Sequence, residues 1–352
     1  MTAAAPTGEG RETGVSSELA DRSRVGGRVG AVNPATPSPT AADVIAAAER
    51  IRPFVHRTPV LTCAAIDAVC RRPVLMKAEH LQKVGAYKAR GATNQIRSLV
   101  ESGAEIPGVV AASSGNHGQA VAWAAGLAGI PATITVPEWI AAPKRAAIEG
   151  YGAGVVVAGS GNEHTGLASD LAARDGLVEV PPFDHPVTIA GQGTWVLEAM
   201  GEAPSDLEGV VVPVGGGGLA SGTALGVEAA GRPVAVYGAE PAGADDTFRS
   251  MQAGTIVAID RPASIADALL SPRPGDVTFP IMRERLAGVV TVTDDQIVAA
   301  MRLLWERAKQ IVEPAGAVAL SAVANGLIPG TGPVMVVLSG GNVDLDTFRF
   351  PG

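Results

Sequence analysis

Lys88 has the sequence environment of a residue that does chemistry. It lies in the segment GAYKARGA, residues 85–92, where small residues flank it, Tyr87 precedes it and no acidic residue is close in sequence. A lysine in such a semi-apolar environment has a lowered pKa, because burial disfavours the charged ammonium. The free amine is then available as the nucleophile that forms Schiff bases with carbonyl compounds. A surface lysine is the usual alternative, but the glycines and the aromatic ring favour a catalytic role here.

Four consecutive glycines, Gly215, Gly216, Gly217 and Gly218, form a second candidate site. They follow the apolar run 210–214 and precede a helix that we expect to begin near Leu219. Glycines at a strand-to-helix turn expose backbone amides with no side chains in the way, and the helix dipole favours an anion there. A tight turn without a ligand would also use glycine. Four in a row at this junction favour a phosphate site, although the Gly-Lys-Ser/Thr sequence of a nucleotide P-loop is absent.

The same turn also approximates a dinucleotide site. Gly215 and Gly217 are followed by the small Ala220, and Glu240 closes the next predicted strand about where a ribose-binding acid belongs. On this segment alone, an NAD-dependent oxidoreductase and a protein that binds another phosphorylated ligand are about equally supported.

Two further loops carry polar groups. The first, SSGNHGQ at residues 113–119, combines the backbone amides of an expected helix start with hydroxyl and amide side chains, which suits a carboxylate ligand. We expect His117 to support this loop and contribute its backbone amide rather than to act as a base. The second, LSGGNVD at residues 338–344, contains Ser339, a neutral hydrogen-bond partner for a ring nitrogen.

Short apolar runs precede these loops and are predicted to be strands. They alternate with Ala-rich helical segments such as 119–128 and 220–230, and a helix is expected to start at the Thr40–Asp43 capping box and end at Pro53. This alternation predicts an α/β fold with parallel-rich sheets covered by helices, in which ligands bind beyond the carboxyl ends of the strands. The predicted strands are 74–78, 109–112, 133–136, 155–157, 210–214, 234–239, 289–292 and 334–338.

The composition excludes several classes of protein. The 352 residues are 47% hydrophobic but only 4% aromatic, and the net charge is −8 with no cluster of like charge. A nucleic-acid or membrane-surface partner would need clustered Lys and Arg, so we expect a small-molecule partner. The first residues lack the apolar core of a secretory signal, and the uncharged stretch 108–137 is interrupted by polar residues and Pro131. Cys63 and Cys70 are predicted to be reduced thiols of a cytoplasmic protein.

In this order, the four loops resemble those of the fold-type II pyridoxal-phosphate (PLP) enzymes, most closely the serine/threonine dehydratases (threonine ammonia-lyases) and serine racemases. The resemblance covers residues 41–350 and includes AGQGT at 190–194, SIAD at 264–267 and EPAGA at 313–317. It implies a two-domain, tryptophan synthase β-like architecture and a homodimer. The implied parts are a flexible N-terminal extension at 1–40, a large cofactor-binding domain at 41–107 and 186–350, and a small domain at 108–185.

The resemblance also implies residue roles. Lys88 would hold PLP as a Schiff base and, once freed, act as the general base, with Tyr87 beside the cofactor. Asn116 would bind the phenolic oxygen of PLP, and Ser339 its pyridine nitrogen. The phosphate would lie on the glycine turn, and the substrate carboxylate on the SSGNHGQ loop. The residues concerned are Gly215, Gly216, Gly217, Gly218 and the Leu219 amide for the phosphate, and Ser113, Ser114, Asn116 and the His117 amide for the carboxylate.

The segment AEPAGADD, residues 239–246, resembles the divalent-cation site of the racemase-like branch. Glu240, the Ala244 carbonyl and Asp246 would be ligands for Mg²⁺ or Ca²⁺, with water completing the oxygen shell. A solvated acidic turn is the alternative. The cation role would give Glu240 a function other than ribose binding, which weakens the dinucleotide hypothesis.

The expected reaction is elimination of the β-hydroxyl of L-threonine or L-serine, giving 2-oxobutanoate or pyruvate and ammonia. Ser114 would allow racemisation from the opposite face of the substrate. Ala86, Tyr87 and Ala268 stand where the family usually has Ser, Phe and often Gly, so 3-hydroxyaspartate or phenylserine are alternative substrates. An NAD-dependent oxidoreductase and a non-catalytic PLP-binding protein are the alternatives from other classes.

Overall fold

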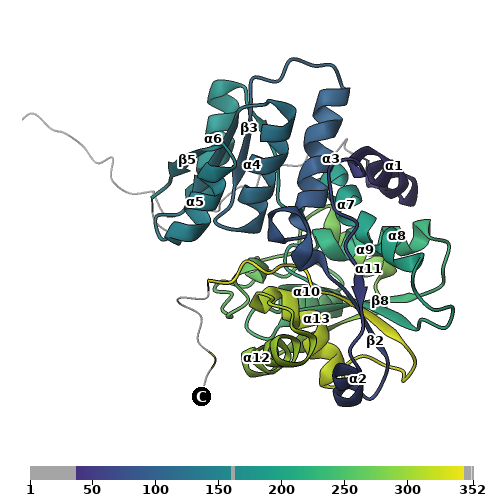
Figure 1. Cartoon of the computed structure of the whole chain (residues 1–352). Helices are drawn as coiled ribbons and strands as arrows, with labels where there is room; N and C mark the ends of the chain where they lie inside the picture. Colours follow the sequence, from purple (N-terminus) through teal and green to yellow (C-terminus); the bar gives the residue numbers. More distant parts are fainter. Residues whose placement is uncertain (1–36, 160–162, 345–349, 351–352) are drawn as a thin grey trace, which may run out of the picture.

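Two β-sheets, each covered by helices, organise the chain (Figure 1). The computed structural model describes residues 37–159, 163–344 and 350, so the predicted flexible extension lies outside the described residues up to residue 36. The larger sheet has six strands in the order β1-β2-β10-β7-β8-β9, and the smaller has four in the order β5-β4-β3-β6. Neighbouring strands are parallel throughout, except that β1 pairs with β2 in the antiparallel sense. The predicted α/β class with parallel-rich sheets is confirmed.

Every predicted strand is present with bounds shifted by two residues at most. The two that the sequence did not indicate, β1 and β6, have two residues each and are too short to show a pattern. The strands are β1 (Val60–Leu61), β2 (Val74–Lys77), β3 (Val109–Ala112), β4 (Ala132–Val136), β5 (Gly154–Val157), β6 (Val178–Glu179), β7 (Gly209–Pro213), β8 (Ala235–Pro241), β9 (Gly288–Val292) and β10 (Val334–Val337).

The helices connect and cover these strands. The Thr40 capping box with Asp43 is present and starts α1, as predicted. The expected helix start at 119 was three residues late, because α4 begins at Asn116. The helices are α1 (Ala41–Ile51), α2 (Ala64–Cys70), α3 (Lys88–Glu101), α4 (Asn116–Ala128), α5 (Ala142–Gly150), α6 (Glu163–Asp175), α7 (Pro186–Gln192), α8 (Thr194–Met200), α9 (Gly218–Ala229), α10 (Asp246–Ala253), α11 (Thr278–Arg285), α12 (Asp294–Leu303) and α13 (Pro314–Ala324), with short turns η1 (Glu79–Leu81), η2 (Lys83–Gly85), η3 (Asp267–Leu269) and η4 (Leu304–Ala308).

The central strands of the larger sheet are buried on both faces. In β10, Val334 and Val336 pack into a core that includes α13, whereas Met335 and Val337 pack into a second core that includes α9. Successive side chains of a strand point to opposite faces, so a sheet covered on both sides needs an unbroken apolar run. This explains why VMVV, VVVP and VLM read as continuous apolar stretches rather than alternating ones.

Helix α3 lies beside α4, with its first turn toward the larger sheet (Figure 1). Ala89, Ala92 and Ile96 belong to the apolar core of the four-stranded sheet, yet α3 also packs against α7, which belongs with the larger sheet. The predicted domain boundary at residue 107 places α3 with the large domain. That division stays a prediction, and α3 is in contact with both parts.

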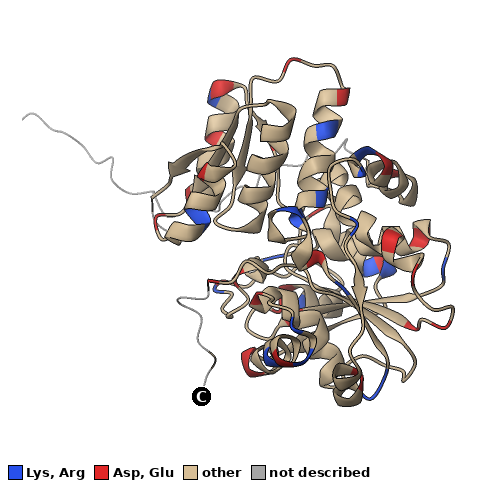
Figure 2. Ribbon diagram, viewed as in Figure 1, with Lys and Arg blue, Asp and Glu red and all other residues tan. Residues whose placement is uncertain are grey.

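Charged residues are intermixed on the outer helices in the view of Figure 2, without a face of one sign. Among the described residues no helix is both long and apolar enough to cross a membrane. Cys63 and Cys70 are free thiols, as predicted.

Gly193→Ala should unfold the protein more easily, because a Cβ at residue 193 would overlap the carbonyl oxygen of Gly222, where the α7–α8 junction crosses α9. We expect a loss of at least about 1–3 kcal/mol in the free energy of unfolding, measured in urea. Gly166→Ala in α6 is the matched control. Outside the backbone of α6 itself, no atom of the described residues lies within 4 Å of the position that its Cβ would take, and alanine favours a helix. Equal stability of the two variants would contradict this packing.

Candidate active site

Lys88 is the first residue of α3 and is half-buried. Its Nζ donates to the carbonyl oxygen of Pro182 at 2.7 Å and lies 5.2 Å from the centre of the Tyr87 ring. Burial lowers the pKa of Lys88 to about 8. Both the neighbouring ring and the lowered pKa were expected from the sequence. An amine of this kind exists partly in its neutral, nucleophilic form near neutral pH.

The other lysines of the chain differ from Lys88. Lys77 forms an ion pair with Glu198, and Lys144 forms one with Asp267. Lys309 is exposed, and Lys83 is half-buried in η2. All five lysines are in the described part of the chain, and Lys88 differs from the ion-paired Lys77 and Lys144 in that its amine donates to a neutral carbonyl and its pKa is lowered by burial.

The segment that leads into Lys88 pairs with the Ser339 loop. The Tyr87 amide donates to the Ser339 carbonyl at 3.0 Å, and the Gly341 amide donates to the Gly85 carbonyl at 2.9 Å. Ser339 is buried, and its hydroxyl donates to the Ala315 carbonyl at 3.4 Å. The loop after β10 therefore lies directly beside the start of α3, as two of the predicted site segments require.

The segment Pro182–Phe183 connects Lys88 to the glycine turn: Lys88 donates to Pro182, and Phe183 packs on the turn. Phe183, the neighbour of Pro182, packs on the turn so closely that a Cβ on Gly216 would overlap its ring. Gly217 has a φ of +92° and is the N-cap of α9, so the turn needs glycine for its backbone as well as for its packing. As at any helix start, the first amides of α9 have no acceptor within the helix.

The SSGNHGQ loop follows β3, and its second half is the first turn of α4. The His117 ring is buried, and its Nε2 donates to the Val180 carbonyl at 2.8 Å. Burial, and then the charge of Lys88, lowers the pKa of His117 to about 3. The ring is therefore neutral and supports the loop, as predicted. Ser113 accepts a hydrogen bond from the Gly115 amide at 3.1 Å, and Ser113 and Ser114 are half-buried.

Glu313 is a site carboxylate to which the sequence analysis gave no role, although it opens the EPAGA motif. Asn116 Nδ2 donates to Glu313 at 2.7 Å, and Asn342 Nδ2 donates to Asn116 Oδ1 at 2.8 Å. These hydrogen bonds fix the orientation of the Asn116 amide and join the loop after β3 to the loop after β10. Burial, and then the charge of Asp267, raises the pKa of Glu313 to about 7.

The predicted cation ligands lie together but away from this cluster. Glu240 accepts from the Phe248 and Thr247 amides at 2.8 and 3.2 Å, at the start of α10. Both carboxylate oxygens of Asp246 are buried without a hydrogen-bond partner in the described part of the structure, and Ala244 is buried. The described residues contain no group of three or more His, Cys, Asp or Glu that could hold a metal ion. The structure thus brings the two carboxylates together but does not establish a cation site.

A family model for pyridoxal-phosphate dependent enzymes matches residues 51–340. The chain belongs to this family. The enzyme is 42% identical over 308 residues to the L-threo-3-hydroxyaspartate ammonia-lyase of Pseudomonas sp., covering 87% of this chain and 96% of that protein. It is 41% identical to the serine racemase of Dictyostelium discoideum, covering 88% and 96%. The crystal structure of the T.th. threonine deaminase is similar with a TM-score of 0.81 and 41% identity, covering 87% and 99%.

The predicted membership in the fold-type II PLP enzymes, close to the serine racemases and threonine dehydratases, is confirmed by these matches. They also support the lyase class and rule against an NAD-dependent oxidoreductase. The residues present fit PLP. The glycine turn offers side-chain-free amides to a phosphate, and Lys88 offers an amine of lowered pKa to an aldehyde. Ser339 offers a neutral hydroxyl on the loop that pairs with the segment before Lys88.

Gly216→Ala should weaken PLP binding by about tenfold or more, because the added methyl group would displace Phe183 and with it the Pro182 carbonyl that holds Lys88. The dissociation constant can be measured by titrating cofactor-free protein with PLP and following visible absorbance. Gly166→Ala again serves as the control. An unchanged dissociation constant for Gly216→Ala would contradict the proposed coupling between the turn and the lysine.

Glu313→Gln should change how stability depends on pH. The folded protein binds the Glu313 proton more tightly than the unfolded chain does, since the pKa rises from 4.5 to about 7 on folding. The wild type therefore loses stability as the pH rises from about 4.5 to 7, whereas the Gln variant avoids this loss. Between pH 5 and 8 the variant should gain on the order of 1–3 kcal/mol relative to the wild type, measured by urea unfolding of the cofactor-free protein.

Glu101→Gln, on the exposed end of α3, is the control for this pH comparison. Parallel stability curves for wild type and Glu313→Gln would show that Glu313 is ionised over the whole range, contrary to its buried environment.

Proposed function

We propose that the chain is a PLP-dependent ammonia-lyase that removes the β-hydroxyl of L-threonine or L-serine, giving 2-oxobutanoate or pyruvate and ammonia. The observation that supports this most is the half-buried Lys88 amine, which donates to Pro182 next to the residue that packs on the glycine turn. Ammonia-lyases and deaminases among the relatives of the chain support the reaction class.

Lys88 is the general base in this proposal. Its lowered pKa keeps a share of the amine neutral near pH 7–8, so it can accept the α-proton of a substrate held beside it. When bound, PLP takes up the negative charge that develops at the substrate α-carbon. The amides of Gly215 to Gly218 and Leu219 would hold the phosphate, while Asn116 and Ser339 would contact the ring.

The first turn of α4 receives the substrate carboxylate in this proposal. Helix-start amides and the helix dipole favour an anion there, and the Ser113 and Ser114 hydroxyls add donors. The neutral His117 ring keeps its proton on Nε2 for Val180, so it offers its main-chain amide rather than acid–base chemistry. Ser114 would be the second proton carrier if the enzyme also racemises serine.

L-threo-3-hydroxyaspartate is the second candidate substrate, because a relative with 42% identity is an ammonia-lyase for that compound. Phenylserine remains the further alternative from the substitutions at Tyr87 and Ala268. The alternative from another class is a non-catalytic PLP-binding protein, in which Lys88 would bind the cofactor but no substrate would be converted.

A divalent cation on Glu240, the Ala244 carbonyl and Asp246 is part of the proposal. The two buried Asp246 oxygens that lack a partner in the described residues support it, because oxygen-rich sites of this kind suit Mg²⁺ or Ca²⁺. The homodimer and the cytoplasmic location stay predictions.

Keto-acid release is the experiment that tests the function. Purified protein loaded with PLP should release keto acid from at least one of L-threonine, L-serine and L-threo-3-hydroxyaspartate, and Lys88→Ala should reduce kcat by at least about 10³-fold, since the base is removed. Lys83→Ala, five residues earlier, should keep nearly full activity. Absence of keto acid from all of these substrates would contradict the proposed ammonia-lyase activity.

Chiral analysis of serine after incubation would show racemisation, which should be lost in Ser114→Ala while keto-acid release persists.

A further inference from the structure

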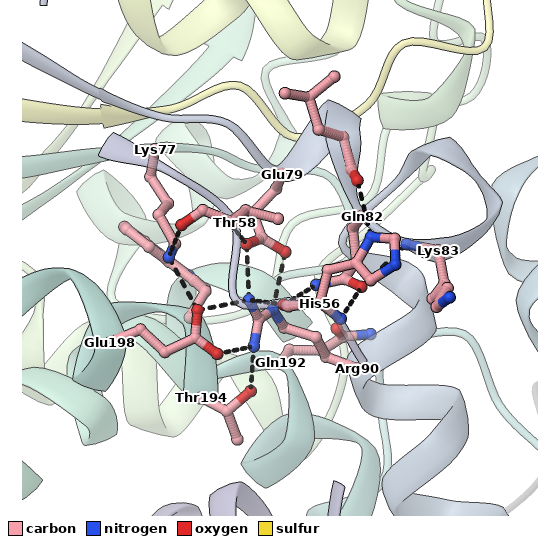
Figure 3. Close-up of polar contacts among 12 residues, drawn as sticks. His56, Thr58, Lys77, Glu79, Gln82, Lys83, Arg90, Gln192, Thr194 and Glu198 are labelled. Atoms are coloured by element: carbon pink, nitrogen blue, oxygen red, sulfur yellow. Dashed lines mark hydrogen bonds and ion pairs between the residues drawn. The ribbon is translucent and has the colours of Figure 1, made fainter. Parts of the chain in front are cut away.

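A buried ion network lies two residues beyond Lys88, around Arg90 (Figure 3). The Arg90 guanidinium donates to both oxygens of Glu79 at 2.7 Å and to the two oxygens of Glu198 at 2.8 and 2.9 Å. It also donates to the Thr194 hydroxyl at 3.3 Å. One side chain of α3 is thereby joined to η1 and to two positions of α8.

Lys77 and Thr58 complete this network, which we call the Arg90 clamp: Thr58, Lys77, Glu79, Arg90 and Glu198. Lys77 Nζ donates to Glu198 at 2.8 Å and to the Thr58 carbonyl at 2.7 Å, and the Thr58 hydroxyl donates to Glu79 at 2.5 Å. The side chains of Lys77, Glu79 and Arg90 are 0% exposed, and that of Glu198 is 21% exposed. Burial alone would raise the pKa of Glu79, but the charge and hydrogen bonds of Arg90 hold it below its ordinary value.

Stability alone gives no reason for such a network. Removing two positive and two negative groups from water costs free energy that their mutual attraction repays only in part, and well-packed apolar residues often do as well or better. What the clamp provides is geometry. A planar guanidinium that donates to two carboxylates at once allows little variation in where its backbone lies.

The residues of the Arg90 clamp connect to two segments of the site, the first turn of α3 and the segment before Ser339. Arg90 shares the first turn of α3 with Lys88, and that turn is seated on α7, where a Cβ on Gly191 would lie 2.8 Å from the Gly91 Cα. The Lys77 carbonyl accepts from the Leu338 amide at 2.9 Å, directly before Ser339. The AGQGT motif, which ends in Thr194, therefore has a structural role: it packs against the first turn of α3.

Helix α3 is also held by the other sheet. Its apolar residues Ala92 and Ile96 pack into the core of the four-stranded sheet, whereas the glycine turn and Ser339 belong to the six-stranded one. Because α3 contacts both parts, the position of its first turn relative to the glycine turn depends on how that first turn is attached to the larger part. The position of Lys88 depends on the same attachment.

We propose that the Arg90 clamp is a positioning device and Arg90 a positioning residue, which fixes Lys88 relative to the glycine turn and Ser339. The inference rests on the proposed role of Lys88. It assigns to Arg90 no contact with substrate or cofactor. Its effect reaches the chemistry only through the position of the lysine.

Arg90→Lys and Glu198→Gln in the PLP-loaded protein test this proposal. Arg90→Lys keeps the charge but cannot donate to two carboxylates in the same way, and Glu198→Gln keeps the size of a partly exposed partner. Both variants should retain the far-UV circular dichroism of the wild type. Both should lower kcat by about 10- to 100-fold, the range expected when a reacting group is displaced by about 1 Å, with KM changed by less than about threefold.

A second readout is independent of turnover. The visible absorption band of the lysine-bound cofactor should shift, and its reduction by borohydride should slow, because the lysine has moved against the ring. Glu101→Gln is the matched control: it lies at the far end of the same helix and breaks an exposed ion pair with Arg50. It should leave kcat, the absorption band and the reduction rate unchanged.

The outcomes separate the possibilities. If both variants only unfold at lower temperature while kcat, absorption and reduction rate equal those of the wild type, the clamp is merely structural and the proposal is wrong. The same holds if KM rises and kcat does not fall. If Arg90→Lys does not fold, Glu198→Gln decides by the same criteria. Failure of the proposed function would look different, since the wild type itself would then release no keto acid.

Discussion

One feature underlies the site: within the described residues, the half-buried amine of Lys88 forms no ion pair with a carboxylate. Lys88 donates to the neutral Pro182 carbonyl, and burial lowers its pKa to about 8. Burial makes the charged ammonium less favourable, so near pH 7–8 a larger share of this amine is neutral than in an exposed lysine. Lys77, whose side chain is fully buried, is stabilised by Glu198 instead. The same residue type thus serves two purposes, and the difference lies in its partners.

The fold brings the other site groups to this amine because its sheets are parallel. The turns after β3, β7 and β10 all follow the carboxyl ends of parallel strands, where α/β proteins bind their ligands. Backbone hydrogen bonds join residues 85–87, which precede Lys88, to the Ser339 loop. The glycine turn is held by the packing of Phe183. Asn116 connects the SSGNHGQ loop after β3 to the rest of the site through its hydrogen bonds with Glu313 and Asn342.

Much of this arrangement was predictable because its signals are local in sequence. Four glycines after an apolar run indicate a strand-to-helix turn, and the small neighbours of Lys88 indicate a lysine in a semi-apolar environment with a lowered pKa. Phe183 and Glu313 carry no such signal. Phe183 matters through its contact with Gly216, and Glu313 through Asn116, which lies 197 residues away in sequence. The start of α4 was misplaced because Ser, Gly and Asn are typical of loops, although Asn116 is helical here. Residue roles toward the cofactor and substrate remain predictions.

Lys88 is proposed to be the lysine that binds the cofactor covalently. The sharpest test is mass-spectrometric peptide mapping of PLP-loaded protein after borohydride reduction, which fixes the cofactor on its lysine. With only five lysines in the chain, every position can be assigned. We predict that Lys88 carries the reduced cofactor, at close to one per chain. Label on Lys77, Lys83, Lys144 or Lys309, with Lys88 unmodified, would contradict the proposed role of Lys88.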